Sequence, residues 1–159
     1  RILILDWDVH HCNGTQHTFY EDPSVLVISL HGHPNYLYPG TGWEEETGDD
    51  RGRGYTMNIP FLPAATDDMY RQAFRDRVIP AIGRFAPQFV LLSVGYDGHS
   101  DDPIGNLDLS DEAFAWMTQT VIGLAEEHAD GRIVSVLEGG YNLGVLKRCA
   151  AEHVRLLAG

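Results

Sequence analysis

Acidic and histidine side chains follow the first apolar run of the sequence. The run Ile2–Leu5 is succeeded by Asp6, Asp8 and His10. Asp8 and His10 are two positions apart, so in an extended segment their side chains leave the same side of the backbone and can converge on one ion. Carboxylate oxygen and neutral imidazole nitrogen are ordinary zinc ligands. A solvated strand end is the alternative, but α/β proteins hold ligands at the carboxyl ends of strands. The pattern therefore predicts a metal site.

A third ligand is expected from a second polar cluster. Asp97 follows the apolar run 89–94, and it can meet Asp8 and His10 across neighbouring strand ends. Three protein ligands with an open position for water and substrate describe a catalytic zinc, whereas a structural zinc is closed by four protein ligands. The set therefore predicts a catalytic metal ion.

Three groups near these ligands have competing interpretations. Asp101 and Asp102 precede Pro103, and capping of a turn is favoured over metal ligation. Cys12 lies beside the first cluster and could ligate zinc as a thiolate, but a small residue packed beneath the site is the simpler interpretation.

The third cluster contains two glycines and a tyrosine. Gly139, Gly140 and Tyr141 follow the apolar run 132–137, and glycines let a backbone approach a ligand closely. A Tyr141 hydroxyl at the mouth of the site can donate a hydrogen bond to a carbonyl oxygen as negative charge develops on it. Taken alone, a Gly-Gly-Tyr turn is more often structural.

Short apolar runs alternate with helical patterns along the chain. Strands are predicted at 2–5, 25–30, 55–61, 89–94 and 132–137. Helices are predicted at 67–85, capped by Thr66 and kinked or divided at Pro80, after Ser110, and at 143–157. In the first helix the inward residues are expected to be Met69, Ala73, Val78 and Ile82. The alternation predicts an α/β fold, with a mostly parallel β-sheet and helices on both faces.

Residues 32–54 form one long irregular stretch, which is expected to lie over the mouth of the site. Its aromatic residues Tyr36, Tyr38 and Trp43 either line an entrance or serve packing alone, and the sequence does not separate the two.

The composition bounds the class of protein. A formal charge of −12 over 159 residues argues against a nucleic-acid partner, which needs a basic face. No apolar run approaches the roughly 20 residues of a membrane span. The two cysteines are far apart and favour a reducing compartment, so a cytoplasmic or nuclear location is expected. We expect a single domain over residues 1–159, and, because the chain opens on Arg1 without an initiator Met, a portion of a larger one.

Five motifs together resemble the zinc-dependent histone deacetylase family, in the broad sense that includes acetylpolyamine amidohydrolases and acetoin-utilisation proteins. They occur in the family's order and cover nearly the whole chain. The Trp of the first motif and the Glu of the last resemble the class II branch of the family more than class I. The motifs are Asp6-Trp7-Asp8-Val9-His10-His11-Cys12-Asn13-Gly14-Thr15-Gln16, Ser29-Leu30-His31, Tyr38-Pro39-Gly40-Thr41-Gly42, Gly95-Tyr96-Asp97 with Asp101-Asp102-Pro103, and Glu138-Gly139-Gly140-Tyr141-Asn142.

The resemblance implies an arginase/deacetylase-like fold, incomplete at its N-terminus, and hydrolysis of a linear amide C–N bond in acetyl-lysine peptides or acetylpolyamines. Zinc, or iron(II), would be held by Asp8, His10 and Asp97, and Tyr141 would polarise the acetyl carbonyl. Tyr38, Gly139 and Gly140 would line the substrate tunnel.

The resemblance also implies two structural potassium ions. The first would be bound by Asp6, Ser29 and main-chain oxygens of Asp8, His10 and Leu30. The second, more peripheral ion would use main-chain oxygens around Phe19, Asp22, Val25 and Tyr55.

The family's general base is a tandem histidine pair in a Gly-His-His setting, and the sequence holds no such setting. His10 is committed to the metal and His11 is expected to face the core, so these two do not replace it. Asp6 and Asn13 match the positions that orient that pair. Cys12 stands where the family has Gly, which would demand a different backbone angle if the Gly had positive φ.

Two alternatives remain. An arginase-like ureohydrolase would use two manganese ions and Asp-x-His-x-Asp motifs, whereas this chain has Asp-x-Asp-x-His. A non-catalytic zinc- or acyl-lysine-binding module, or a truncated remnant inactive for want of its base, is the alternative from another class.

Overall fold

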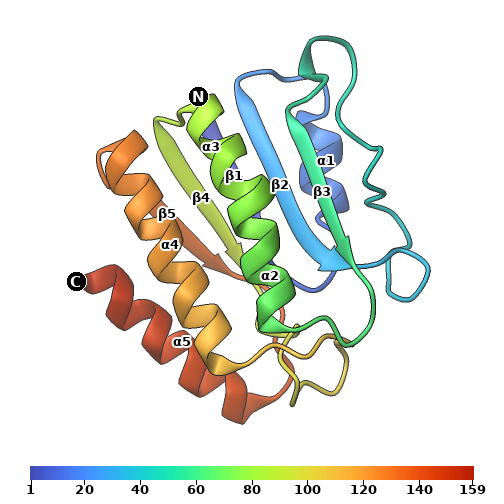
Figure 1. Cartoon of the computed structure of the whole chain (residues 1–159), viewed down its shortest axis with the longest axis vertical. Coiled ribbons are helices and arrows are strands. Elements are labelled where there is room, and N and C mark those ends of the chain that lie inside the picture. Colours follow the sequence, from blue (N-terminus) through green and yellow to red (C-terminus); the bar gives the residue numbers. More distant parts are fainter.

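A computed structural model describes all 159 residues and contains one sheet of five parallel strands in the order β3-β2-β1-β4-β5 (Figure 1). The five predicted strands are confirmed, with bounds that shift by at most two residues. The strands are β1 Ile2–Asp6, β2 Val25–Gly32, β3 Thr56–Phe61, β4 Phe89–Val94 and β5 Ile133–Leu137.

One face of the sheet is covered by the long helices (Figure 1). α2 Asp67–Ala73, the π-helical turn η2 Phe74–Val78 and α3 Ile79–Phe85 form a continuous path. α4 Asp111–Ala129 and α5 Leu143–Ala158 complete the layer. None of the helices is both long and apolar enough to cross a membrane.

The predicted division of the first helix occurs as the π turn before Pro80, which occupies the first turn of α3, where its missing N–H costs least. Thr66 is at the cap position, but its hydroxyl makes no capping hydrogen bond. The prediction that Met69 faces inward is wrong, because Met69 is 44% exposed while the next residue, Tyr70, is 1% exposed.

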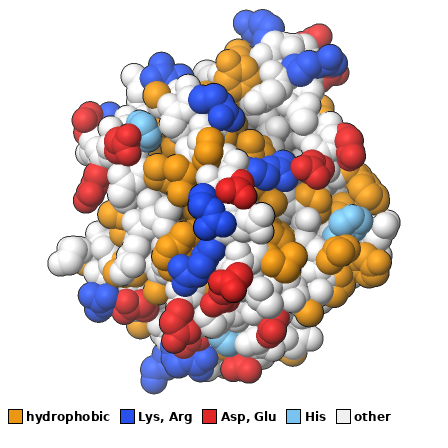
Figure 2. Space-filling view, in the orientation of Figure 1, with side chains coloured by type: hydrophobic (Ala, Val, Ile, Leu, Met, Phe, Trp, Pro, Cys, Tyr) orange, Lys and Arg blue, Asp and Glu red, His pale blue; other side chains and the backbone are white.

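The other face of the sheet is covered less completely. The short helix α1 Asn13–Phe19 lies behind β2 (Figure 1). Val134 and Val136 of β5 are 46% and 52% exposed, respectively. Helices therefore lie on both faces, as predicted, but the two layers are unequal. On the helical face, basic side chains alternate with acidic and apolar ones (Figure 2).

The strand ends place the functional loops side by side. Asp6 at the end of β1 pairs with Ser93 of β4, and Val94 pairs with Leu137 of β5. The segments that follow these three strands therefore start next to one another at the carboxyl edge of the sheet. This register, rather than sequence proximity, brings the three polar clusters together.

Candidate metal centre

Asp8, His10 and Asp97 meet at this edge, as predicted. One ligand atom from each lies within 4.8 Å of the others. Nδ1 of His10 is 3.0 Å from Oδ1 of Asp8 and 3.2 Å from Oδ2 of Asp97. The side chain of Asp97 is fully buried, whereas that of His10 is 22% exposed. The group is thus open at His10 and, to a smaller extent, at Asp8, whose side chain is 12% exposed.

Backbone amides fix the two carboxylates. Asp97 Oδ1 accepts from Val9 N at 2.9 Å, and Asp8 Oδ2 accepts from Gly139 N at 2.8 Å. Asp8 Oδ1 accepts from His10 N at 2.8 Å. Each bond joins one strand-end segment to itself or to a neighbour, so the backbone holds both carboxylates in place.

The charges at this site are strongly coupled. Burial raises the pKa of Asp97, while hydrogen bonds from His10 and Gly139 hold the pKa of Asp8 below its usual value despite burial. The hydrogen bond to Asp8, then that to Asp97, raises the pKa of His10 to about 10. Two carboxylates that draw positive charge to one point are a donor set suited to a divalent cation.

Two observations show that the residues fit a metal ion. Oδ2 of Asp97 is buried and, apart from the contact with His10 Nδ1 at 3.2 Å, has no hydrogen-bond donor facing it, an expensive arrangement for a carboxylate oxygen unless a cation is also bound there. Glycines leave room beside the same oxygens, since a Cβ at Gly139 would collide with Asp97 Oδ2 and lie 2.6 Å from Asp8 Oδ2. A Cβ at Gly95 would collide with Asp8.

A cavity of about 540 Å³ is lined by Asp8 and His10, while the buried Asp97 does not border it. Tyr38, Gly139, Gly140 and Tyr141 line it, so every residue predicted for the tunnel and the oxyanion contact borders this space. Burial, followed by the nearby carboxylates of Asp97 and Asp8, raises the pKa of Tyr141. Its hydroxyl is therefore a proton-bearing donor at neutral pH.

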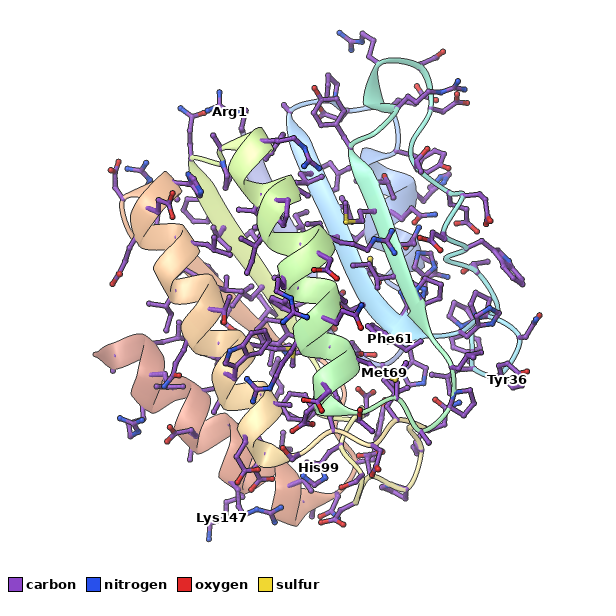
Figure 3. The ribbon with its side chains drawn as sticks, in the orientation of Figure 1. Arg1, Tyr36, Phe61, Met69, His99 and Lys147 are labelled. Carbon is purple, nitrogen blue, oxygen red and sulfur yellow. The ribbon has the colours of Figure 1, made fainter.

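Of the three aromatic residues in the long loop, one borders the cavity and two serve packing. Tyr38 borders the cavity, and its ring lies edge-on to His10 at 6.3 Å. Tyr36, at the outer rim of the loop (Figure 3), and Trp43 pack instead against His33, with ring centroids at 5.7 and 5.3 Å. Only Tyr38 faces the site.

A second group of polar residues lies behind the ligands. We call it the histidine network, and its members are His11, Gln16, His31, Glu46 and Asn58. Gln16 Oε1 accepts from His11 Nε2 at 2.9 Å and from Asn58 Nδ2 at 2.7 Å, and Gln16 Nε2 donates to Glu46.

The two histidines of the network are neutral and tie the loop to the sheet. His31 Nε2 donates to Gly42 O at 2.9 Å, so Nδ1 accepts from the Ser29 hydroxyl. Burial lowers the pKa of His31 to about 4 and also lowers the pKa of His11. His11 was expected to face the core, and it is buried, with hydrogen bonds to Thr41 and Gln16, although it also borders the cavity.

The remaining predicted residues are less closely tied to the ligands. Cys12 has φ −74°, so this position does not require the positive φ that would favour Gly. Burial raises the pKa of its thiol to about 12, which does not favour a thiolate ligand. Asn13 borders the cavity, but its Oδ1 accepts from Gly14 N of its own turn. Asp6 is buried and accepts from Asp8 N at 2.9 Å.

The residues predicted to bind potassium fall at two ends of the sheet. Asp6 and Ser29 are register partners at the carboxyl edge, next to the ligands. Val25 pairs with Ile2 at the opposite edge, and Asp22 precedes it with its carboxylate bound to Ser24. Both potassium sites remain predictions.

Sequence reasoning interpreted Asp102 as a turn cap, which is confirmed by a 2.9 Å bond from Ile104 N to its Oδ1. It missed that the other oxygen, Oδ2, accepts from Tyr141 N at 2.7 Å. It also missed the roles of Gln16, Glu46 and Asn58. The only sequence signal for Asp102 was its position directly before Pro103. This signal predicts a local turn, but it does not predict a hydrogen bond to a residue far away in the sequence.

The fold and the site define an α/β protein with a candidate metal centre at the carboxyl edge of a parallel sheet. Comparison with known proteins agrees with this class. The family described as Histone deacetylase domain matches residues 1–157. The chain belongs to this family.

Proteins from two different organisms are similar to this chain in sequence. It is 48% identical to a probable deacetylase of Archaeoglobus fulgidus over 143 residues, which are 90% of this chain and 39% of that protein. It is 42% identical to a histone deacetylase-like amidohydrolase of Pseudomonas aeruginosa over the whole chain and 42% of that protein. These names place the family among the hydrolases.

Solved structures share the fold. The HDA15 HD domain superposes with a TM-score of 0.93 at 40% identity over 99% of this chain and 44% of that one. An acetylpolyamine aminohydrolase from Burkholderia pseudomallei gives 0.91 at 30% identity over 100% of this chain and 45% of that one. The arginase/deacetylase-like fold is thereby confirmed. The chain spans about two fifths of the length of these curated relatives.

Proposed function

We propose that this chain carries the metal-binding part of a zinc-dependent amidohydrolase that removes acetyl groups from acetyl-lysine peptides or acetylpolyamines. The observation that carries the proposal is the convergence of Asp8, His10 and Asp97, with two carboxylates sharing one imidazole, beside a cavity bordered by Tyr141. Zinc fits a site of two carboxylates and one imidazole, and iron(II) is the second candidate.

Each protein group has a separate task in this reaction. Bound zinc would polarise the acetyl carbonyl and lower the pKa of a water molecule. The Tyr141 hydroxyl would donate a hydrogen bond to the carbonyl oxygen as negative charge develops on it. Tyr38 and the backbone of Gly139 and Gly140 would border the acyl-lysine side chain, because all three line the same cavity.

The base that accepts the water's proton is proposed to come from residues outside this sequence. His10 is held between two carboxylates, and both ring nitrogens of His11 are already hydrogen-bonded. No other adjacent histidine pair occurs in the chain. The chain is accordingly proposed to be the C-terminal portion of the catalytic domain, inactive by itself.

The substrates are proposed from the family, and the charge of the chain is compatible with them. Acetyl-lysine peptides and acetylpolyamines are commonly cationic, and the chain has a formal charge of −12. Electrostatic attraction of such substrates is expected, and contact with nucleic acid or membrane is not. A cytoplasmic or nuclear location is proposed with it.

The test is hydrolysis of an acetyl-lysine peptide and of an N-acetylated polyamine by the zinc-loaded protein. The 159-residue chain and the same chain extended to the length of its relatives would be assayed in parallel. The extended protein should turn over, and Tyr141→Phe should lower kcat by about a hundredfold or more while leaving zinc content unchanged. Binding of the acetyl-lysine peptide without turnover by the extended protein would favour the non-catalytic module instead.

A further inference from the structure

Each oxygen of the Asp102 carboxylate accepts hydrogen bonds from two backbone amides. The residue is 8% exposed. Its Oδ1 accepts from Ile104 N at 2.9 Å and Gly105 N at 3.2 Å. Its Oδ2 accepts from Tyr141 N at 2.7 Å and Asn142 N at 3.2 Å. A carboxylate offers about four lone-pair sites, and here four donors are bound.

These bonds join two loops that are far apart in sequence. A turn cap would require only the pair of bonds at Oδ1. The second oxygen holds the segment that begins with Gly139 and Gly140, which have no side chains to fix it. Gly139 is secured at its other side by the Asp8 carboxylate at 2.8 Å. The tyrosine therefore follows a short glycine segment that is secured by one carboxylate before it and one after it.

Asp102 is itself rigidly placed. Its amide donates to His99 O at 2.9 Å, and His99 Nδ1 accepts from Asp101 N at 2.9 Å. His99 Nε2 donates to Asp111 at 2.9 Å, which fixes the turn to the start of α4 (Figure 3). The turn can thus act as a fixed support rather than moving with the tyrosine loop.

We propose that Asp102 is a positioning residue for Tyr141. It sets the backbone of the tyrosine so that the hydroxyl faces the cavity beside Asp8 and His10. The idea rests on the proposed function for the role of Tyr141 in turnover, but the backbone restraint can be tested without turnover. Asp102 makes no contact with substrate in this account and acts only through the tyrosine loop.

The first arm compares Asp102→Asn with Asp101→Asn by amide hydrogen exchange of the 159-residue chain. Asparagine has one carbonyl oxygen, so it can satisfy only one of the two amide pairs. Asp101 is exposed, and its side chain makes no hydrogen bond, so this neighbour controls for the lost charge. Exchange of the Tyr141 and Asn142 amides should accelerate about tenfold or more in Asp102→Asn only, since about 1.4 kcal/mol corresponds to tenfold. Equal exchange in both variants would overturn the proposal.

The second arm is a double-mutant cycle in the extended, zinc-loaded protein. Asp102→Asn alone should lower kcat about tenfold or more with KM within about threefold, and Asp101→Asn should not. In a Tyr141→Phe background, Asp102→Asn should cost nothing further, because its effect passes through the tyrosine hydroxyl. A further additive loss would mean that Asp102 acts elsewhere and would overturn the proposal. Lack of turnover by the wild type would count against the proposed function, while the exchange arm would still decide on Asp102.

If Asp102→Asn does not fold, amide hydrogen exchange of the wild-type chain still tests the proposal. The Tyr141 and Asn142 amides should be strongly protected relative to the amide of Leu143, whose residue is 78% exposed. Protection no greater than that of Leu143 would show that the hydrogen bonds from Tyr141 and Asn142 to Asp102 are not maintained in solution. It would overturn the proposal.

Discussion

The metal centre and the histidine network lie next to each other and contain similar residue types, yet their chemistry is opposite. In the network, both nitrogens of His11 and of His31 have neutral partners. In the metal centre, two carboxylates share one imidazole, and Asp97 Oδ2 has no hydrogen-bond donor besides the His10 Nδ1 that Asp8 also uses. The network also leaves an atom unpaired, Asn58 Oδ1, but it is a neutral amide oxygen. The comparison teaches that two carboxylates sharing a single positive group, rather than a collection of His and Asp, mark a candidate ligand site.

The largest expected effect comes from removing one of these two carboxylate charges. Asp97→Asn keeps an oxygen for Val9 N but takes away the negative charge of the carboxylate, so zinc affinity should fall by about a hundredfold or more. Asp101→Asn, with the same change at an exposed position, should retain one zinc per chain. Metal content after equilibration with limiting zinc is the measurement. Full zinc loading of Asp97→Asn would remove the distinction between the two clusters.

Breaking the network should harm folding instead of metal binding. Gln16→Ala removes a side chain that bonds to His11, Asn58 and Glu46, so the free energy of unfolding should fall by about 2–4 kcal/mol. The matched substitution Gln119→Ala, on the exposed face of α4, should change it by about 0.5 kcal/mol or less. Urea unfolding measures both. Equal losses in the two variants would show that the network contributes little.

The neutral state of His31 predicts a pH dependence. Its pKa is about 4 in the folded chain, below the value of 6.5 for a free histidine. The unfolded state therefore takes up the proton first, so stability is unaffected above about pH 6.5 and is lost as the pH falls from there towards about 4. At pH 5 this group should account for roughly 2 kcal/mol.

Urea unfolding at pH 7 and pH 5 would check this, with His31→Gln as the comparison. The variant should lose less stability than the wild type on acidification, whatever its stability at pH 7. An identical loss in both proteins would mean that the proton is taken up elsewhere.

Cys12 should give the smallest effect, because it belongs to neither cluster. Cys12→Gly should retain zinc and lower the free energy of unfolding by about 0.5–1 kcal/mol, the usual cost of glycine's freedom in the unfolded chain. Zinc content and urea unfolding are again the readouts. Loss of zinc in this variant would make the thiol a ligand and would extend the metal centre beyond three residues.

Much of this protein was readable from its sequence. The five strands, the alternation with helices and the convergence of Asp8, His10 and Asp97 near Tyr141 could be predicted from local patterns, because each polar cluster comes directly after an apolar run. Local patterns did not predict correctly which residues of a helix face the core. Met69 and Tyr70 are adjacent, and only packing of α2 against the sheet decides which of them is buried.

Tertiary structure alone decided how the clusters support one another. The register of β1, β4 and β5 sets Gly139 against Asp8 and Tyr141 against Asp102. It also decided that Tyr38 borders the cavity while Trp43 packs on His33. Residue types and short spacings determine which groups can do chemistry, since those depend on neighbours along the chain. Hydrogen bonds between residues 39 or 131 positions apart leave no local pattern, because they form only when strand order has brought distant loops together.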